Sequence, residues 1–189
     1  MDVERPFTEI NVMLGSKRYF EDKTESVIWI PEKEYAPGSW GYVGGKPYEK
    51  RTRYGTQPAS DYDIMGTTND PVFQTMRINL DAFKMDVPNG EYTISFYWAE
   101  LQSDKEREAS VYSLGNDAVK EGFSKRSFDV DINSINVVKE LDLTKEYGAQ
   151  RAVIKKFIVT VGNNEGITVN FKKGTGEPIL NAIRVYRNY

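Results

Sequence analysis

The stretch Val87 to Glu100, "VPNGEYTISFYWAE", decides the fold class of this 189-residue chain. Its Pro-Asn-Gly sequence is a strong turn signal. After the turn, large apolar residues occupy every second position, at Tyr92, Ile94, Phe96 and Trp98. In an extended chain such residues share one face, so the stretch predicts a β-strand with that face buried.

The same alternation recurs further along the chain, in segments that carry β-branched and aromatic residues. These segments are 127–133, 153–161, 167–171 and 179–187. Several short strands with Gly, Asn and Pro turns between them predict an all-β fold, an antiparallel β-sandwich. The last segment places Asn181 on its apolar face, and a buried asparagine needs hydrogen-bond partners.

The length suits a single domain over residues 1–189. Two regions interrupt the rhythm of the strands. Residues 31–71 are rich in Gly, Pro and aromatics and are expected to be irregular, and a polar insertion is expected at about 102–126, with its best short helix at 103–109. Long irregular segments in compact domains often carry function.

The segment 38–45, "GSWGYVGG", sets Trp40 and Tyr42 among four glycines. Glycine adopts backbone conformations that other residues avoid. The segment is therefore either a binding surface that displays two rings or a tight corner that packs them inside. If both Trp40 and the later Tyr62 serve one site, Trp40 must reach solvent beside Tyr62.

Composition excludes several kinds of chemistry. The chain has neither cysteine nor histidine, which excludes thiolate nucleophiles, Ser-His-Asp triads and imidazole metal sites. Paired carboxylates remain an alternative for a glycosidase, with Glu100 at the end of its apolar strand as the best-placed acid. The net charge of −3 argues against nucleic acid, and no apolar run is long enough to predict a membrane helix.

Asp129, Asp131, Asn133 and Glu140 share the spacing of an EF-hand calcium loop. Ser134 stands where that loop requires glycine. The alternation of Phe128, Val130 and Ile132 explains the same segment as a strand with one wet face, which is the interpretation we favour. No metal or other cofactor is predicted.

The sequence resembles the malectin-like domains over most of its length, from Ile10 to Tyr186. The markers that carry the resemblance are "INV" at 10–12 with Gly15, "VIWI" with Trp29, "GYVGG" at 41–45, "GT" at 66–67, "DPVFQTMR" at 70–77, residues 87–100, "SFDVDIN" at 127–133, "ELDL" at 140–143 and "PILNAIRV" at 178–185. The resemblance implies a non-catalytic jelly-roll sandwich, galactose-binding-like, that binds carbohydrate. It is most similar to bacterial modules attached to β-galactosidase-like glycoside hydrolases of family 2, whose parent enzymes are expected in the periplasm or outside the cell.

Only some of the family's sugar-binding residues are present at the matching positions of this sequence. The sugar-facing tyrosine of the family matches Tyr62 in "SDYD", but its second tyrosine falls on Ile78. Its aromatic pair falls on Gln102 and Ser103, and its aspartate falls near Gly176, beside Glu177. A rebuilt sugar site is therefore expected. The residues expected to bind carbohydrate are Tyr62, Trp40, Tyr42, Gln102 and Glu177.

The sequence thus predicts a carbohydrate-binding accessory module of a larger glycoside hydrolase, with galactosides or glucosides as ligands and the catalytic domains of the parent enzyme as partners. Flat aromatic rings would cover the C–H faces of sugars while polar side chains bond their hydroxyls. Two alternatives stay open. One is a structural module that packs on the other domains of its enzyme without binding sugar, and the other is a carboxylate glycosidase.

Overall fold

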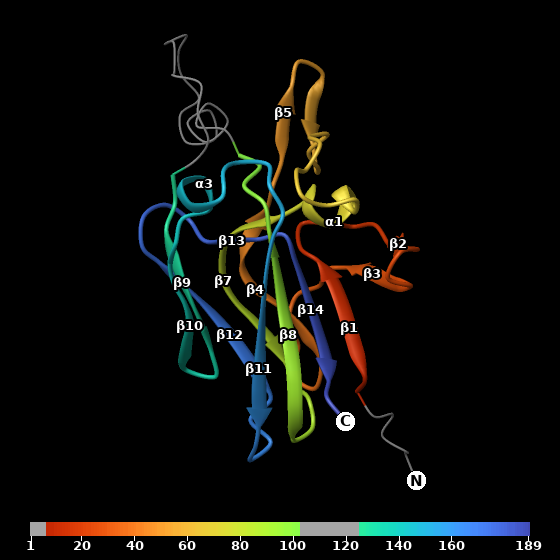
Figure 1. Ribbon diagram of the computed structural model, residues 1–189, viewed down its shortest axis with the longest axis vertical. Helices are drawn as coiled ribbons and strands as arrows, with labels where there is room; N and C mark the ends of the chain where they lie inside the picture. Colours follow the sequence, from red (N-terminus) through yellow and green to blue (C-terminus); the bar gives the residue numbers. More distant parts are fainter. Residues whose placement is uncertain (1–6, 103–124) are drawn as a thin grey trace.

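The protein is described by a computed structural model over residues 7–102 and 125–189. The expected helix at 103–109 and nearly all of the insertion at 102–126 lie outside these residues. Two sheets face one another and form a β-sandwich (Figure 1). The prediction of an all-β sandwich is confirmed.

The first sheet has six strands, and all its pairings are antiparallel except that of β1 with β3. In spatial order its strands are β11 (Val153–Val161), β8 (Gly90–Trp98), β14 (Ala182–Arg187), β1 (Glu9–Met13), β3 (Val27–Pro31) and β2 (Phe20–Asp22).

The second sheet is antiparallel, and β7 holds it together by pairing with three other strands. Its strands are β10 (Ile135–Leu141), β9 (Phe128–Ile132), β12 (Ile167–Lys173), β7 (Arg77–Met85), β13 (Ile179–Leu180) and β4 (Trp40–Pro47), which pairs with β7. The hairpin β5 (Lys50–Thr52) and β6 (Gly55–Gln57) projects from one end, near the short helices α1 (Asp70–Phe73) and α3 (Leu143–Glu146) (Figure 1). Each of these helices has four residues, and no helix among the described residues could cross a membrane.

Strand β8 lies at the centre of the core, as its sequence predicts. Tyr92, Ile94, Phe96 and Trp98 have no exposed surface. The opposite face of β8 is covered too, because Tyr97 packs edge-on against Trp29 with ring centroids 5.0 Å apart. The strand is therefore buried on both faces.

The segment 179–187 forms two strands where the sequence predicts one. The chain leaves the second sheet after β13 and enters the first sheet as β14, and the crossing occurs at Asn181. Asn181 is fully buried. Its amide donates to the carbonyls of Phe73 and Thr75 at 2.8 and 3.0 Å, and its oxygen accepts from the Ala99 N–H at 2.8 Å. The expected partners exist, and they anchor α1 to the end of β8.

The EF-hand-like segment is a β-hairpin, as the strand interpretation predicts. Asn133 and Ser134 form the turn between β9 and β10 with φ values of 45° and 70°. Asp131 pairs with Lys172 on the neighbouring strand and accepts a hydrogen bond from Asn136. Within 7–102 and 125–189, no three carboxylates or other metal-binding groups gather at one point.

Residues 31–71 are more regular than expected, because they contain the eight-residue strand β4. Its ladder with β7 is broken by a register shift between Val43 and Gly44. The glycines therefore form a bulge inside a strand, and they do not form a free loop.

Candidate functional site

Three of the five residues expected to bind sugar, Tyr62, Gln102 and Glu177, lie on loops that hydrogen bonds connect to one another. The loop of Tyr62 is joined to that of Gln102 through Gln150, whose carbonyl accepts from Met65 and whose N–H donates to the Glu100 carbonyl. Arg126 joins Gln102 to Glu177. The fold thus gathers these loops from distant parts of the sequence.

Trp40 lies at the other end of the β4–β7 ladder. It pairs with Met85, whereas the loop of Tyr62 is attached near the start of β7, where Ser60 donates to Gln74. At about 3.3 Å per residue the two ends are roughly 30 Å apart. Trp40 is half-buried, stacks on Phe83 at a centroid distance of 6.2 Å and has the Lys33 ammonium over its ring. Trp40 and Tyr62 therefore do not contribute to one site.

Tyr42 belongs to a packed corner around Arg77. The Arg77 guanidinium lies over the Tyr42 ring, 3.3 Å from its centroid, and donates to both carboxylate oxygens of Glu32 at 2.7 and 2.8 Å. It also donates to the carbonyls of Gly44 and Gly45 at 3.1 and 2.9 Å. The "GYVGG" bulge thus provides backbone carbonyls that bind a buried arginine. The glycines therefore form a tight, packed corner, and they do not display the Tyr42 ring on a loop.

Tyr62 presents a half-buried ring beside charged groups. The Lys50 ammonium lies 4.4 Å from the ring centroid and pairs with Asp61. The backbone of Tyr62 is fixed at both ends, because its N–H donates to the Ser60 hydroxyl and its carbonyl accepts from the Gln74 amide. A ring flanked by an ammonium and a carboxylate offers the two kinds of contact that a sugar needs.

Gln102 and Glu177 surround a buried ion pair between Glu100 and Arg126. The Glu100 carboxylate is 2.6 Å from Nε of Arg126, and both side chains are almost completely buried. Arg126 donates to the Gln102 amide oxygen at 3.1 Å and to the Glu177 carbonyl at 2.7 Å. Burial raises the pKa of Glu100, and the nearby guanidinium opposes that rise.

This geometry removes Glu100 as the acid of a carboxylate glycosidase. Its side chain has no exposed surface and is enclosed by Arg126. A catalytic carboxylate must reach the proton or atom on which it acts. The role of Glu100 that the contacts support is structural, because it orders the loop that contains Gln102.

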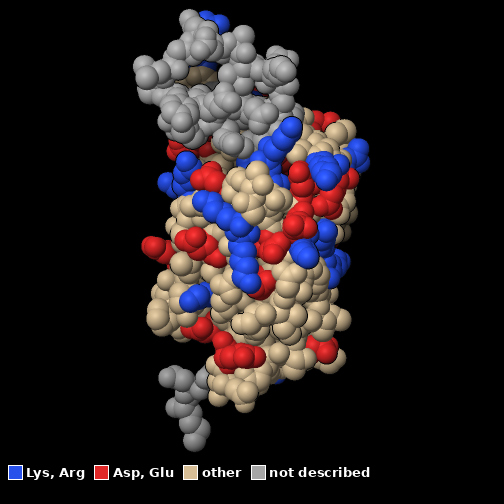
Figure 2. Space-filling model, turned by 90° about the vertical axis from the view of Figure 1, so that its left-hand side faces the viewer, with Lys and Arg blue, Asp and Glu red and all other residues tan. Residues whose placement is uncertain are grey.

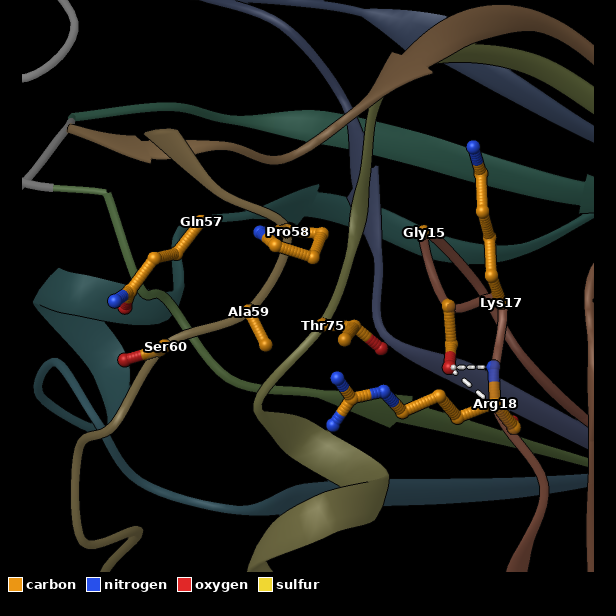
Figure 3. A pocket seen from close by; sticks show the side chains of 9 residues that line it. Gly15, Lys17, Arg18, Gln57, Pro58, Ala59, Ser60 and Thr75 are labelled. Carbon is orange, nitrogen blue, oxygen red and sulfur yellow. Dashed lines mark hydrogen bonds between the residues drawn. The ribbon is translucent and has the colours of Figure 1, made fainter. Parts of the chain in front are cut away.

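A separate pocket lies beside the loop of Tyr62, and none of the five expected residues lines it. Its volume is about 370 Å³. We call it the Arg18 pocket, and its lining residues are Gly15, Ser16, Lys17, Arg18, Gln57, Pro58, Ala59, Ser60 and Thr75 (Figure 3). None of these described lining residues has an aromatic ring, which is why a search for ring clusters in the sequence misses the pocket.

The walls of the Arg18 pocket are held by backbone contacts. Gly15 has φ = 73°, and a Cβ there would overlap the Met76 carbonyl, so the 15–18 turn lies directly on the chain that follows α1. The Ser16 hydroxyl bonds both the N–H and the carbonyl of Arg18, at 3.1 and 3.3 Å. The pocket is therefore formed before any ligand arrives.

Most of the chain matches a known family. Residues 12–184 fit the family model of the malectin domain, so the chain belongs to that family. A search of curated protein sequences found no match.

Solved structures extend this result. The chain is 28% identical to part of Bacteroides uniformis β-glucuronidase 2, with a TM-score of 0.76 over 96% of this chain and 18% of that one. It also resembles the plant receptor-like kinase FER and the extracellular domain of ANXUR1 from Arabidopsis thaliana. The TM-scores are 0.64 and 0.63, the identities 15% and 10%, and each comparison covers 95% of this chain and 42% of the other. The chain thus corresponds to less than a fifth of the length of the bacterial enzyme.

Proposed function

We propose that this domain is a non-catalytic carbohydrate-binding module of a larger glycoside hydrolase. The observation that carries the proposal is the clustering of Tyr62, its Lys50–Asp61 pair and the Arg18 pocket at one end of a malectin-type sandwich. Loops held at the end of a rigid scaffold are a common place for ligand sites. The 28% identity to part of a β-glucuronidase supports a glycosidase as the parent enzyme.

In this proposal the domain breaks no bond. A glycan that it holds stays near the catalytic domain, which raises the local substrate concentration. Tyr62 would supply the apolar contact and Glu177 would lie on a neighbouring loop, whereas Gln102 is buried and its amide oxygen already accepts from Arg126. Trp40 and Tyr42 contribute to the stability of β4.

The test is a calorimetric titration of the 189-residue chain with methyl glucosides, galactosides and glucuronides, and with neutral and acidic plant polysaccharides. We expect saturable binding that Tyr62→Ala weakens at least tenfold. Tyr54→Ala is the matched control, because Tyr54 is an 87% exposed ring on the nearby hairpin. A folded chain that binds no member of the panel would refute the proposal.

One observation favours the alternative of a packing module. Ile154 and Ile158 on β11 and Ile135 on β10 are 48%, 68% and 69% exposed. Both strands are sheet edges. Figure 2 views that side of the molecule and shows charges of both signs interspersed, with a largely uncharged area below them. If this face packs on another domain, I154K/I158K will lower association with the rest of the enzyme and leave sugar binding unchanged.

A further inference from the structure

We propose that the Arg18 pocket binds the carboxylate of an acidic sugar, a uronic acid residue of the glycan. This inference rests on the proposed function and names the class of sugar. It adds a subsite to which none of the residues expected from the sequence contributes.

The dimensions of the pocket suit one sugar ring. Ligand pockets in proteins measure about 300–1,000 Å³, and this one, at about 370 Å³, is at the small end of that range. Pro58, Ala59 and the methyl group of Thr75 supply apolar surface for the C–H bonds of a pyranose. Ser60 lines the pocket and lies two residues before Tyr62, so a glycan could extend from one subsite to the other.

A buried hydroxyl lies in the wall. Thr75 is only 8% exposed, and its Oγ1 has no hydrogen-bond partner among the described residues. In Figure 3 Thr75 lies between Ala59 and the Arg18 side chain, with its oxygen on the side of the 15–18 turn. A buried hydroxyl without a partner is costly. That oxygen is covered in this structure, so a sugar hydroxyl, which is both donor and acceptor, would satisfy it only after the Thr75 side chain rotates toward the pocket.

The positive charges that line the pocket favour an anionic ligand. Lys17 and Arg18 both line it, and none of its described lining residues carries a carboxylate. Arg77, Arg126 and Arg184 each have a glutamate partner. Arg18 has none within 7–102 and 125–189, and Figure 3 shows its guanidinium reaching to a point below Thr75.

A guanidinium without an acidic partner among the described residues, beside a preformed cavity, matches the planar geometry of a carboxylate, which accepts two parallel N–H bonds. Because the bacterial neighbour is a β-glucuronidase, we assign the anion as a uronate and not as a sulfate ester. A sulfated sugar serves as a comparison ligand in the test.

The test compares methyl β-D-glucuronide, methyl β-D-glucoside and glucose 6-sulfate by calorimetry with the whole chain. We expect the glucuronide to bind at least tenfold more tightly than the glucoside, with an advantage that shrinks as salt is added. Arg18→Gln should remove that advantage. Arg53→Gln is the matched control, since Arg53 is also exposed and basic but lies on the hairpin over Tyr54.

Thr75→Val should weaken the glucuronide and the glucoside alike, because it removes a contact to the ring hydroxyls. The outcomes separate the two proposals. Equal affinity for glucuronide and glucoside, or a glucuronide advantage that survives Arg18→Gln, would overturn the uronate assignment while leaving sugar binding intact. Preference for the sulfated sugar would overturn it too. Absence of binding to any sugar would refute the proposed function itself.

Discussion

The guanidinium of Arg77 lies 3.3 Å from the centroid of the Tyr42 ring, inside a bulge whose two glycine carbonyls accept its N–H groups. This contact explains why "GYVGG" combines an aromatic ring with a glycine pair. The ring covers the charge from one side, the carbonyls bond it from another, and Glu32 neutralises it.

Arg77→Leu should destabilise the domain by about 3–5 kcal/mol, because it leaves the Glu32 carboxylate buried without a partner. The Glu32 side chain is 10% exposed. Urea unfolding followed by fluorescence measures the loss. Removing both charges in E32L/R77L should recover much of the stability, and a double variant as unstable as the single one would contradict this account.

Gly45→Ala tests the bulge itself. Gly45 has φ = 71°, and a Cβ there would lie 2.6 Å from the Ile78 carbonyl. We expect a loss of about 1–3 kcal/mol from strain and displacement. Gly38→Ala isolates the conformational part, because Gly38 has φ = 77° with open space around it. If the two variants lose equal stability, the close approach to Ile78 does not matter.

The fold could be predicted well from the sequence, because apolar residues at every second position indicate a strand with a buried face. The segments around Ile94, Phe157 and Val169 form strands at nearly the expected positions. The prediction failed at Asn181, where an apolar run hides a change of sheet. That change depends on hydrogen bonds to Phe73 and Thr75, more than a hundred residues away along the chain.

The candidate site was harder to predict, since ring-bearing residues signal packing and binding alike. Trp40 and Tyr42 have similar sequence surroundings to a displayed pair of rings, yet their contacts are with Phe83 and Arg77. The Arg18 pocket depends on the 15–18 turn meeting Thr75, two segments that no local pattern connects. That Arg18 has no acidic partner among the described residues becomes visible only once the neighbouring side chains have been placed.

Acid should weaken the fold partly through Asp131. The hydrogen bond and charge of Lys172 lower the pKa of Asp131, and Asn136 adds to that effect. Because the folded pKa is below that of an unfolded aspartate, about 3.9, the stabilisation is present above that pH. It is lost as pH falls through the lower folded value.

Asp131→Asn should therefore flatten the decline of unfolding free energy with acid, measured by urea titrations between neutral pH and about pH 2. Asp63→Asn is the control, because Asp63 is exposed and has no ion-pair partner among the described residues. An unchanged acid profile in Asp131→Asn would show that the pair with Lys172 does not stabilise the native state.

The Thr75→Val variant tests whether the Thr75 hydroxyl stabilises the fold or serves ligand binding. Valine has the same shape, and the hydroxyl that it removes has no partner among the described residues. The free energy of unfolding should therefore stay the same or rise by about 1 kcal/mol. Thr93 is equally exposed, at 8%, but its hydroxyl bonds Asn188 at 2.9 Å.

Thr93→Val should accordingly lose about 1 kcal/mol in the same urea titrations. A hydroxyl that costs stability, yet whose removal weakens sugar binding, would be retained for its ligand. Should Thr75→Val lose as much stability as Thr93→Val, the Thr75 hydroxyl is already satisfied within the fold. The Arg18 pocket would then lose the buried group that points to a bound sugar.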